Sequence, residues 1–356
     1  MGDWLGRTIE LDVTNIAHGG VSVARHDGRV VFVADAIPGE RVLARVSSDS
    51  KKSFWRAETV EVLEASPHRQ PHVWDAAALD RDPVDRAGGA EFGHIELAHQ
   101  RELKRQVITD SLARMARLER DVTVEAVPGD DERAGTGWRT RVRLHVDDQG
   151  RPGPFAARSH RVIPVTSLPL ATAELEASAP LGERFDGYES VDVLNPSTGG
   201  VRLIVGNQKS SVITERVGER EFRLADSGFW QVHRGAAATL TEAVQSAIDP
   251  ELFDPQAANL DLYGGVGLLA AAVADRFGPS TRITSVRATR PRPTSPPRTC
   301  RNGSEREPRR VASSAGWPRS RHPLAPRSAS DSPGRLSFST LPARAPDEMS
   351  SRRSRG

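Results

Sequence analysis

The sequence contains a single cysteine, Cys300, among its 356 residues. One thiol excludes an internal disulfide framework and any metal site built from several cysteines, and it fits a reducing compartment. The sequence also lacks an apolar run of about 18 residues, so we expect no transmembrane helix and no membrane partner. Its first residues, Met1–Gly6, have neither the basic nor the apolar region of a secretory signal. We therefore expect a soluble, cytoplasmic, monomeric protein.

Lysine is missing from the last part of the chain. Residues 287–356 hold 16 arginines, no lysine and five acidic residues, a net charge of +11, whereas the whole chain carries only +2. Arginine, serine and proline together make up 40 of these 70 residues. Such a composition buries too little apolar surface to offset chain entropy, so we expect residues 287–356 to be a disordered tail.

Five short segments rich in valine, isoleucine and leucine occupy the first 65 residues, with glycine-containing turns between them. Strands at this spacing, with no intervening helix, predict a small closed barrel like the OB fold over residues 1–65. Periodicity alone leaves any other five-stranded β module equally open. The expected strands are Thr8–Val13, Val21–Arg25, Val30–Val33, Arg41–Val46 and Ala57–Leu63.

Residues 66–232 are expected to form a central α+β domain. An irregular stretch leads to a helix over residues 97–118, in which Leu103, Val107 and Leu112 lie at helical spacing. The basic residues on its other side are typical of a solvated helix face. The clearest strands that follow are Arg139–Val146, Val162–Val165, Ser190–Leu194, Gly200–Val205 and Ser210–Glu215.

Residues 233–286 have the pattern that opens a doubly wound α/β domain. A helix over 236–248, an apolar strand over 259–263, an alanine-rich helix over 268–277 and a strand over 283–286 follow one another. The pattern then stops, so we expect an incomplete Rossmann-like domain. The predicted fold is a multidomain α/β protein: a β-barrel, a central α+β domain, the start of the Rossmann-like domain and the tail.

Two segments suggest binding chemistry. Leu260–Gly267 is glycine-rich between a strand and a helix, which suits S-adenosylmethionine, a nucleotide or simply a tight turn. In Ser227–His233, Phe229 and Trp230 precede Gln231. They could stack on a base beside one hydrogen-bonding amide. Because aromatic residues more often fill cores, the favoured interpretation is a core-facing Phe229, an edge Trp230 and a solvated Gln231.

These segments resemble parts of the RNA uracil-5-methyltransferase family, in the family's order and over about residues 7–286. Ala17–Ala24 and Val33–Glu40 resemble a TRAM domain, which is an OB-like RNA-binding module. Gly137–Leu144 resembles a strand of the family's central domain. Phe229–Val232 resembles its Phe-x-Gln-Val segment, and Asp261–Gly267 resembles its methyl-donor turn.

The resemblance implies the activity and the roles of several residues. It implies transfer of a methyl group from S-adenosyl-L-methionine to C5 of a uridine in ribosomal or transfer RNA. Gln231 and Tyr263 match positions that contact the donor, and Gly265 lies in the same turn, so the three are expected to line one cleft. Arg139 and Arg141 match a strand near the RNA. The helix over 97–118 is expected to pack on the methyltransferase domain.

The sequence departs from the family's pattern at its metal site. Many members bind an iron–sulfur cluster through four cysteines, and the matching stretch here is Ala87–Ile95. Ala90 stands where a ligand cysteine would be, so no iron–sulfur cluster and no metal ligand are expected. His233 also replaces the usual asparagine after Gln-Val.

The catalytic motifs are the second departure. The family's thiolate adds to C6 of uracil, the resulting enolate attacks the donor methyl group, and a base removes the C5 proton. Neither the Asp-Pro-Pro-Arg nor the Cys-Asn-Pro motif occurs, and Arg287 takes the place of the acid that holds the donor ribose. Cys300 lies in the expected tail, where nothing would position it. We therefore assign no catalytic residue and expect the chain to be inactive.

Two explanations of the tail remain open. The change of composition after Val286 suggests translation in a shifted reading frame, in which case another frame would encode the acid and both missing motifs. A basic arm of a non-catalytic RNA-binding protein is the alternative. The nucleotide sequence from codon 280 onward would decide between them.

Overall fold

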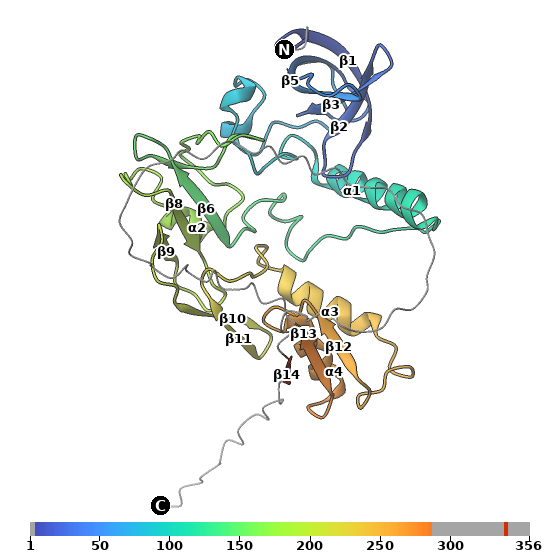
Figure 1. Ribbon diagram of the computed structural model, residues 1–356, viewed down its shortest axis with the longest axis vertical. Coiled ribbons are helices and arrows are strands. Elements are labelled where there is room, and N and C mark those ends of the chain that lie inside the picture. Colours follow the sequence, from blue (N-terminus) through green and yellow to red (C-terminus); the bar gives the residue numbers. More distant parts are fainter. Residues whose placement is uncertain (1–3, 287–337, 341–356) are drawn as a thin grey trace, which may run out of the picture. The chain divides into compact units, whose positions relative to one another are not determined.

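The structure is a computed structural model that describes residues 4–286 and 338–340 (Figure 1). The chain divides into two compact units, Met1–Asp249 and Pro250–Gly356. Among the described residues, no helix is both long and apolar enough to cross a membrane.

The first unit begins with a closed five-stranded barrel in the order β1-β2-β3-β5-β4. Alternate residues along β1 point inward, and Ile9, Leu11 and Val13 are buried there. All neighbours pair antiparallel except β3 and β5, which are parallel. The predicted five-stranded barrel is confirmed, with strands β1 (Thr8–Ile16), β2 (Ser22–His26), β3 (Arg29–Ala34), β4 (Arg41–Ser48) and β5 (Phe54–Glu64).

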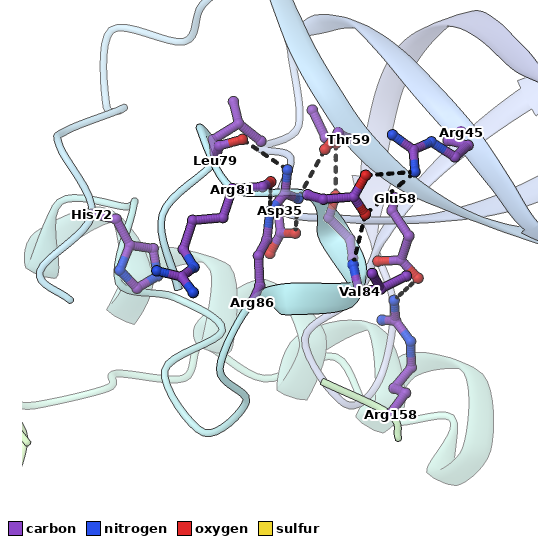
Figure 2. Close-up of polar contacts among 12 residues, drawn as sticks. Asp35, Arg45, Glu58, Thr59, His72, Leu79, Arg81, Val84, Arg86 and Arg158 are labelled. Atoms are coloured by element: carbon purple, nitrogen blue, oxygen red, sulfur yellow. Dashed lines mark hydrogen bonds and ion pairs between the residues drawn. The ribbon is translucent and has the colours of Figure 1, made fainter. Parts of the chain in front are cut away.

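A buried arginine joins the barrel to the segment that follows it. Arg86 lies after two short 3₁₀ helices, Asp75–Ala77 and Pro83–Asp85, and is only 3% exposed. Its guanidinium donates to Asp35 Oδ2 (2.7 Å) and to the carbonyls of Thr59 (2.9 Å) and Leu79 (2.8 Å), as Figure 2 shows. Because a buried cation needs such partners, the barrel and the segment depend on each other.

A second buried pair lies beside the first. The carboxylate of Glu40 is fully buried and accepts from Arg69 Nε (2.6 Å) and Nη2 (2.7 Å). It also accepts the backbone N–H groups of Ile37 (2.8 Å) and Ser66 (3.1 Å). Burial alone would raise the pKa of Glu40, but these hydrogen bonds and the charge of Arg69 lower it below its ordinary value.

Helix α1 (Leu97–Ser111) continues into a π-helical turn, Leu112–Ala116, and ends at Arg117 in the left-handed conformation. It is therefore slightly shorter than the predicted 97–118. Its buried residue Leu103 packs with Ile16 and Ile37 of the barrel, and Gln106 donates to Asn15 Oδ1 (2.9 Å). The helix thus packs on the barrel, and a contact with the methyltransferase domain stays a prediction.

The central region contains a four-stranded antiparallel sheet in the order β7-β6-β8-β9 and a separate hairpin. Leu144, Leu175, Val191 and Val193 are completely buried in its core. The predicted strand Val162–Val165 is wrong, since only an isolated bridge joins Val162 to Phe155. The elements are β6 (Arg141–Val146), β7 (Pro152–Gly153), α2 (Ala173–Ser178), β8 (Ser190–Leu194), β9 (Arg202–Val205), β10 (Val212–Val217), β11 (Arg220–Ala225) and α3 (Ala236–Ala247).

The second unit has a strand–turn–helix–strand start. Strands β12 (Asn259–Leu262) and β13 (Ile283–Val286) pair in parallel, and α4 (Leu268–Phe277) connects them. A third strand, β14 (Phe338–Thr340), pairs antiparallel with β13. The expected disorder of residues 287–356 stays a prediction. The rest of the expected tail, with Cys300, lies outside the described residues.

Candidate functional site

Two segments singled out in the sequence form one structure in the first unit. The N–H of Thr140 donates to the carbonyl of Val232 (2.7 Å), and the N–H of Arg234 donates to that of Trp138 (2.9 Å). The ring of His233 stacks on Trp138, with 5.3 Å between the ring centroids. Since these pairs are about 90 residues apart in sequence, the fold itself assembles the site from both segments.

The two adjacent aromatic residues have opposite environments. Trp230 is 7% exposed and packs on Phe222, with ring centroids 5.5 Å apart, whereas Phe229 is 79% exposed. The favoured interpretation, a buried Phe229 beside an edge Trp230, is therefore wrong, because Trp230 is the buried residue and Phe229 is the exposed one. Phe229 is left as a free aromatic face next to the amide of Gln231.

Gln231 lines a cavity of about 420 Å³ together with Thr172, Glu174 and Asn195. Within the part of the chain that the structure describes, nothing hydrogen-bonds its side-chain amide. An amide on a cavity wall without an internal partner is free to bind a ligand.

A buried carboxylate fixes the loop before Phe229. Asp226 is 5% exposed and accepts from the hydroxyls of Ser210 (2.7 Å) and Ser211 (2.6 Å) and from the N–H of Ser227 (2.8 Å). Burial alone would raise the pKa of Asp226, but these hydrogen bonds lower it to about 2. This network could not be predicted from the sequence, because Ser210 and Ser211 precede β10 whereas Asp226 and Ser227 follow β11.

The two arginines that the resemblance placed near RNA differ in their contacts. Arg141 donates to the carbonyl of Gly228 (2.8 Å) and to the nearly buried carboxylate of Glu215 (3.3 Å). Arg139 has no ion pair among the described residues, and its Nε is buried without a hydrogen-bond partner. Arg141 thus supports the loop before Gln231, whereas Arg139 is available to a ligand.

The donor-type turn lies in the second unit. Tyr263 and Gly265 both have positive φ (61° and 55°), and Tyr263 is 87% exposed. A Cβ on Gly264 would lie 2.1 Å from Ser285 Oγ and 2.2 Å from Asp261 Oδ2, so the turn approaches β13 closely. The N–H groups at the start of α4 face the same turn and suit an anionic or polar ligand. That Gln231, Tyr263 and Gly265 line one cleft stays a prediction, because they belong to different units.

The residues where the family's cluster would bind do not fit it. Ala87 and Ala90 are 4% and 7% exposed and pack in an apolar cluster with Trp74 and Leu168. Iron–sulfur clusters are held by thiolates, and alanine methyl groups offer no ligand. Among residues 4–286 and 338–340, no group of three or more histidine, cysteine or acidic side chains could hold a metal.

Comparisons with known proteins agree with this architecture. Residues 4–60 match the TRAM domain. An uncharacterized RNA methyltransferase of Streptomyces avermitilis is 34% identical over 325 residues, covering 79% of this chain and 72% of the relative. The 23S rRNA (uracil(1939)-C(5))-methyltransferase RlmD of Halomonas elongata is 33% identical over 222 residues, covering 58% of this chain and 42% of the relative.

A solved structure shares the fold. It is that of the Pyrococcus abyssi tRNA (uracil-54, C5)-methyltransferase in complex with S-adenosyl-L-homocysteine. It superposes with a TM-score of 0.52 at 17% identity and covers 75% of this chain and 70% of that one. Because the Streptomyces relative matches 79% of this chain at 34% identity and residues 4–60 match the TRAM domain, this chain belongs to the RNA uracil-5-methyltransferase family.

Proposed function

We propose that the protein descends from enzymes that use S-adenosylmethionine to methylate C5 of a uridine in ribosomal or transfer RNA, and that it keeps their binding sites. The observation that carries this proposal is the joining of the Gly137–Leu144 strand to the Phe229–His233 segment. The joined segments present an exposed aromatic face, a free amide and an unpaired arginine in one unit. Relatives named for uracil-C5 methylation of ribosomal and transfer RNA support the same reaction.

We further propose that Gln231, Tyr263 and Gly265 contact the methyl donor. The free amide of Gln231 suits the polar groups of S-adenosylmethionine, and the exposed ring of Tyr263 can stack on an adenine. Gly265 keeps the turn open to the ligand because it carries no side chain. The donor, when bound, supplies an electrophilic methyl group.

The remaining chemistry needs a thiolate, which no described residue offers, and a base, for which we assign no residue. Cys300 is the sequence's one thiol and lies outside the described part. Because Arg287 also stands in place of the donor-ribose acid, we propose that this 356-residue chain binds RNA without transferring the methyl group.

The alternative function is RNA binding by a protein that takes no part in methylation. The net charge of +11 on residues 287–356 favours it, because such a segment attracts phosphate. In this alternative the TRAM barrel and the basic segment bind RNA, and the donor turn serves only the fold.

The decisive experiment combines methyl transfer with two binding measurements. The protein should bind unmodified ribosomal or transfer RNA. When labelled S-adenosylmethionine is added, no labelled methyl group should appear in the RNA. Incorporation that is lost in Cys300→Ala would contradict the inactivity and support the full reaction. If the protein binds S-adenosylmethionine at equilibrium and Gln231→Ala weakens this binding, the methyltransferase origin is favoured. If the protein does not bind S-adenosylmethionine, the alternative is favoured.

A further inference from the structure

A second cavity lies in the first unit. Its volume is about 690 Å³, within the range of roughly 300–1,000 Å³ that small-molecule sites occupy. The barrel turn His18–Gly20, the segment Gly89–Gly93, helix α1 and the Trp138–Arg139 pair all contribute to its wall. Gln231 does not line it, so within the first unit it is distinct from the cavity that Gln231 lines.

The cavity contains a positive charge, that of Arg139, with which no described residue makes an ion pair. Burial lowers the pKa of Arg139, and the charge of Glu91 offsets this only in part. Glu91 also lines the cavity, but its carboxylate accepts the N–H of Gly89 (2.8 Å) and makes no ion pair with Arg139 among the described residues. Lys104 of α1 lines the same cavity, also without an ion pair in the described part of the chain. Buried or half-buried charge without a partner is costly, so the cavity favours an anionic ligand.

The walls beside this charge are flat and held in place. Trp138 Nε1 donates to the carbonyl of Gly135 (2.9 Å), and the guanidinium of Arg139 lies 4.9 Å from the centroid of the Trp138 ring. On the barrel side, a Cβ on Gly20 would lie 3.0 Å from the ring of Phe92, so a glycine there allows the turn to approach this ring. Aromatic and guanidinium planes of this kind stack on unstacked bases.

We infer that this cavity binds one unstacked RNA nucleotide other than the uridine to be methylated. Its base lies against Trp138 and Phe92, and its phosphate faces Arg139 and Lys104. The inference rests on the proposed RNA-binding function and adds a second nucleotide pocket to it. Such a pocket would fix the register of the RNA, because the nucleotide is held jointly by the barrel turn, α1 and the central domain.

The first test measures binding of a single-stranded RNA of about ten nucleotides to the full chain as a function of salt. Arg139→Gln should weaken binding about tenfold, or about 1.4 kcal/mol. It should also reduce the slope of log K against log salt by about 0.7, the value for one lost phosphate contact on a single strand. Lys104→Gln, on an exposed helix face with little risk to folding, should reduce the slope similarly. Arg184→Gln is the matched control, since Arg184 is exposed, pairs with Asp186 and lines neither this cavity nor that of Gln231, so its loss should change neither quantity.

The second test asks whether the site recognises a base. Uridine 5′-monophosphate should bind at least several-fold more tightly than ribose 5-phosphate, and Trp138→Leu should abolish the difference. Equal affinities for the two ligands would overturn the nucleotide assignment. Wild-type RNA affinity in both Arg139→Gln and Lys104→Gln would overturn the pocket while leaving the proposed function intact. Failure of the unmodified chain to bind any RNA would instead remove the proposed function itself.

Discussion

The two compact units differ in how they bury their apolar strands. In the first unit the alternating apolar residues of β1 are at most 6% exposed, and Leu144 of β6 is completely buried. In the second unit Leu260 and Leu262 of β12 are 62% and 61% exposed, and of residues 250–286 only Gly267, Ala270, Ala272 and Ser285 are buried. Parallel sheets normally have both faces covered. The first unit thus contains its own cores, whereas the second leaves an apolar face of its sheet exposed.

The largest effect is expected at the junction of the barrel and the following segment. Arg86→Met should lower the free energy of unfolding by about 3–5 kcal/mol, because Asp35 and three carbonyls lose a buried donor. Chemical denaturation followed by tryptophan fluorescence measures this. Arg216→Met, at an exposed pair, is the control and should have little effect. A similarly small effect of Arg86→Met would show that the barrel and the segment do not stabilise each other.

The comparison of the cores can be tested with one leucine from each unit. Leu144→Ala should cost about 2–5 kcal/mol of unfolding free energy, because it leaves a cavity in a packed core. Leu262→Ala removes the same atoms from an exposed strand and should change it by less than about 0.5 kcal/mol. Thermal or denaturant unfolding of both variants gives the comparison. A large cost for Leu262→Ala would mean that β12 is covered in solution.

A buried histidine predicts a pH dependence of the first unit. His94 is 5% exposed, and burial, with smaller effects from Arg69 and His72, lowers its pKa to about 3; Glu40 acts in the opposite direction. The unfolded chain binds this proton near pH 6.5, whereas the folded chain does not. The contribution of neutral His94 to the free energy of unfolding is therefore complete above about pH 6.5. It falls by ~1.4 kcal/mol per pH unit as the pH decreases toward 3.

The measurement is the unfolding free energy between pH 7 and pH 4 for the parent chain and His94→Leu. The variant should show a flatter dependence, although His72, whose pKa burial also lowers, keeps part of it. His18→Leu, on the exposed barrel turn, should leave the slope unchanged. Parallel curves for the parent and His94→Leu would contradict a neutral buried His94.

The smallest effect is expected at the exposed aromatic face beside Gln231. Phe229→Ala should change stability by less than about 0.5 kcal/mol, because the ring is 79% exposed. Trp230→Ala, one residue further, should cost about 3–5 kcal/mol as a buried aromatic residue. Thermal unfolding of the two variants measures the contrast. Equal losses would mean that Phe229 also packs against the protein.

Local patterns predicted most of the barrel and the strand–turn–helix of the second unit. The alternation in Thr8–Ile16 and the glycine turns are local, and helix α4 has the predicted bounds, 268–277. Helix α2 was missed because six residues are too few for a periodic pattern. It forms where Leu175 is buried and the Thr172 hydroxyl caps the helix.

The contacts that define the candidate site could not be predicted in the same way. Arg139 and Arg141 look equivalent in the sequence, yet Glu215 and Gly228, 74 and 87 residues away, pair only with Arg141. The burial of Trp230 depends on its contact with Phe222, which the sequence analysis did not place in a strand. The donor-type turn was predicted from its local glycines, whereas many of the residues that line the cavity with Gln231, such as Thr172 and Asn195, are distant from it in the sequence.

The network around Arg86 also limits how far the barrel can be treated as a portable module. Asp35, Thr59 and Glu40 direct their acceptors at Arg86 and Arg69, which lie beyond the last barrel strand. A barrel excised at residue 65 and fused to another protein would expose two carboxylates that its own residues do not neutralise. The smallest transferable RNA-binding cassette should therefore extend through Arg86, and gene fusions that end at the TRAM boundary should yield poorly folded protein.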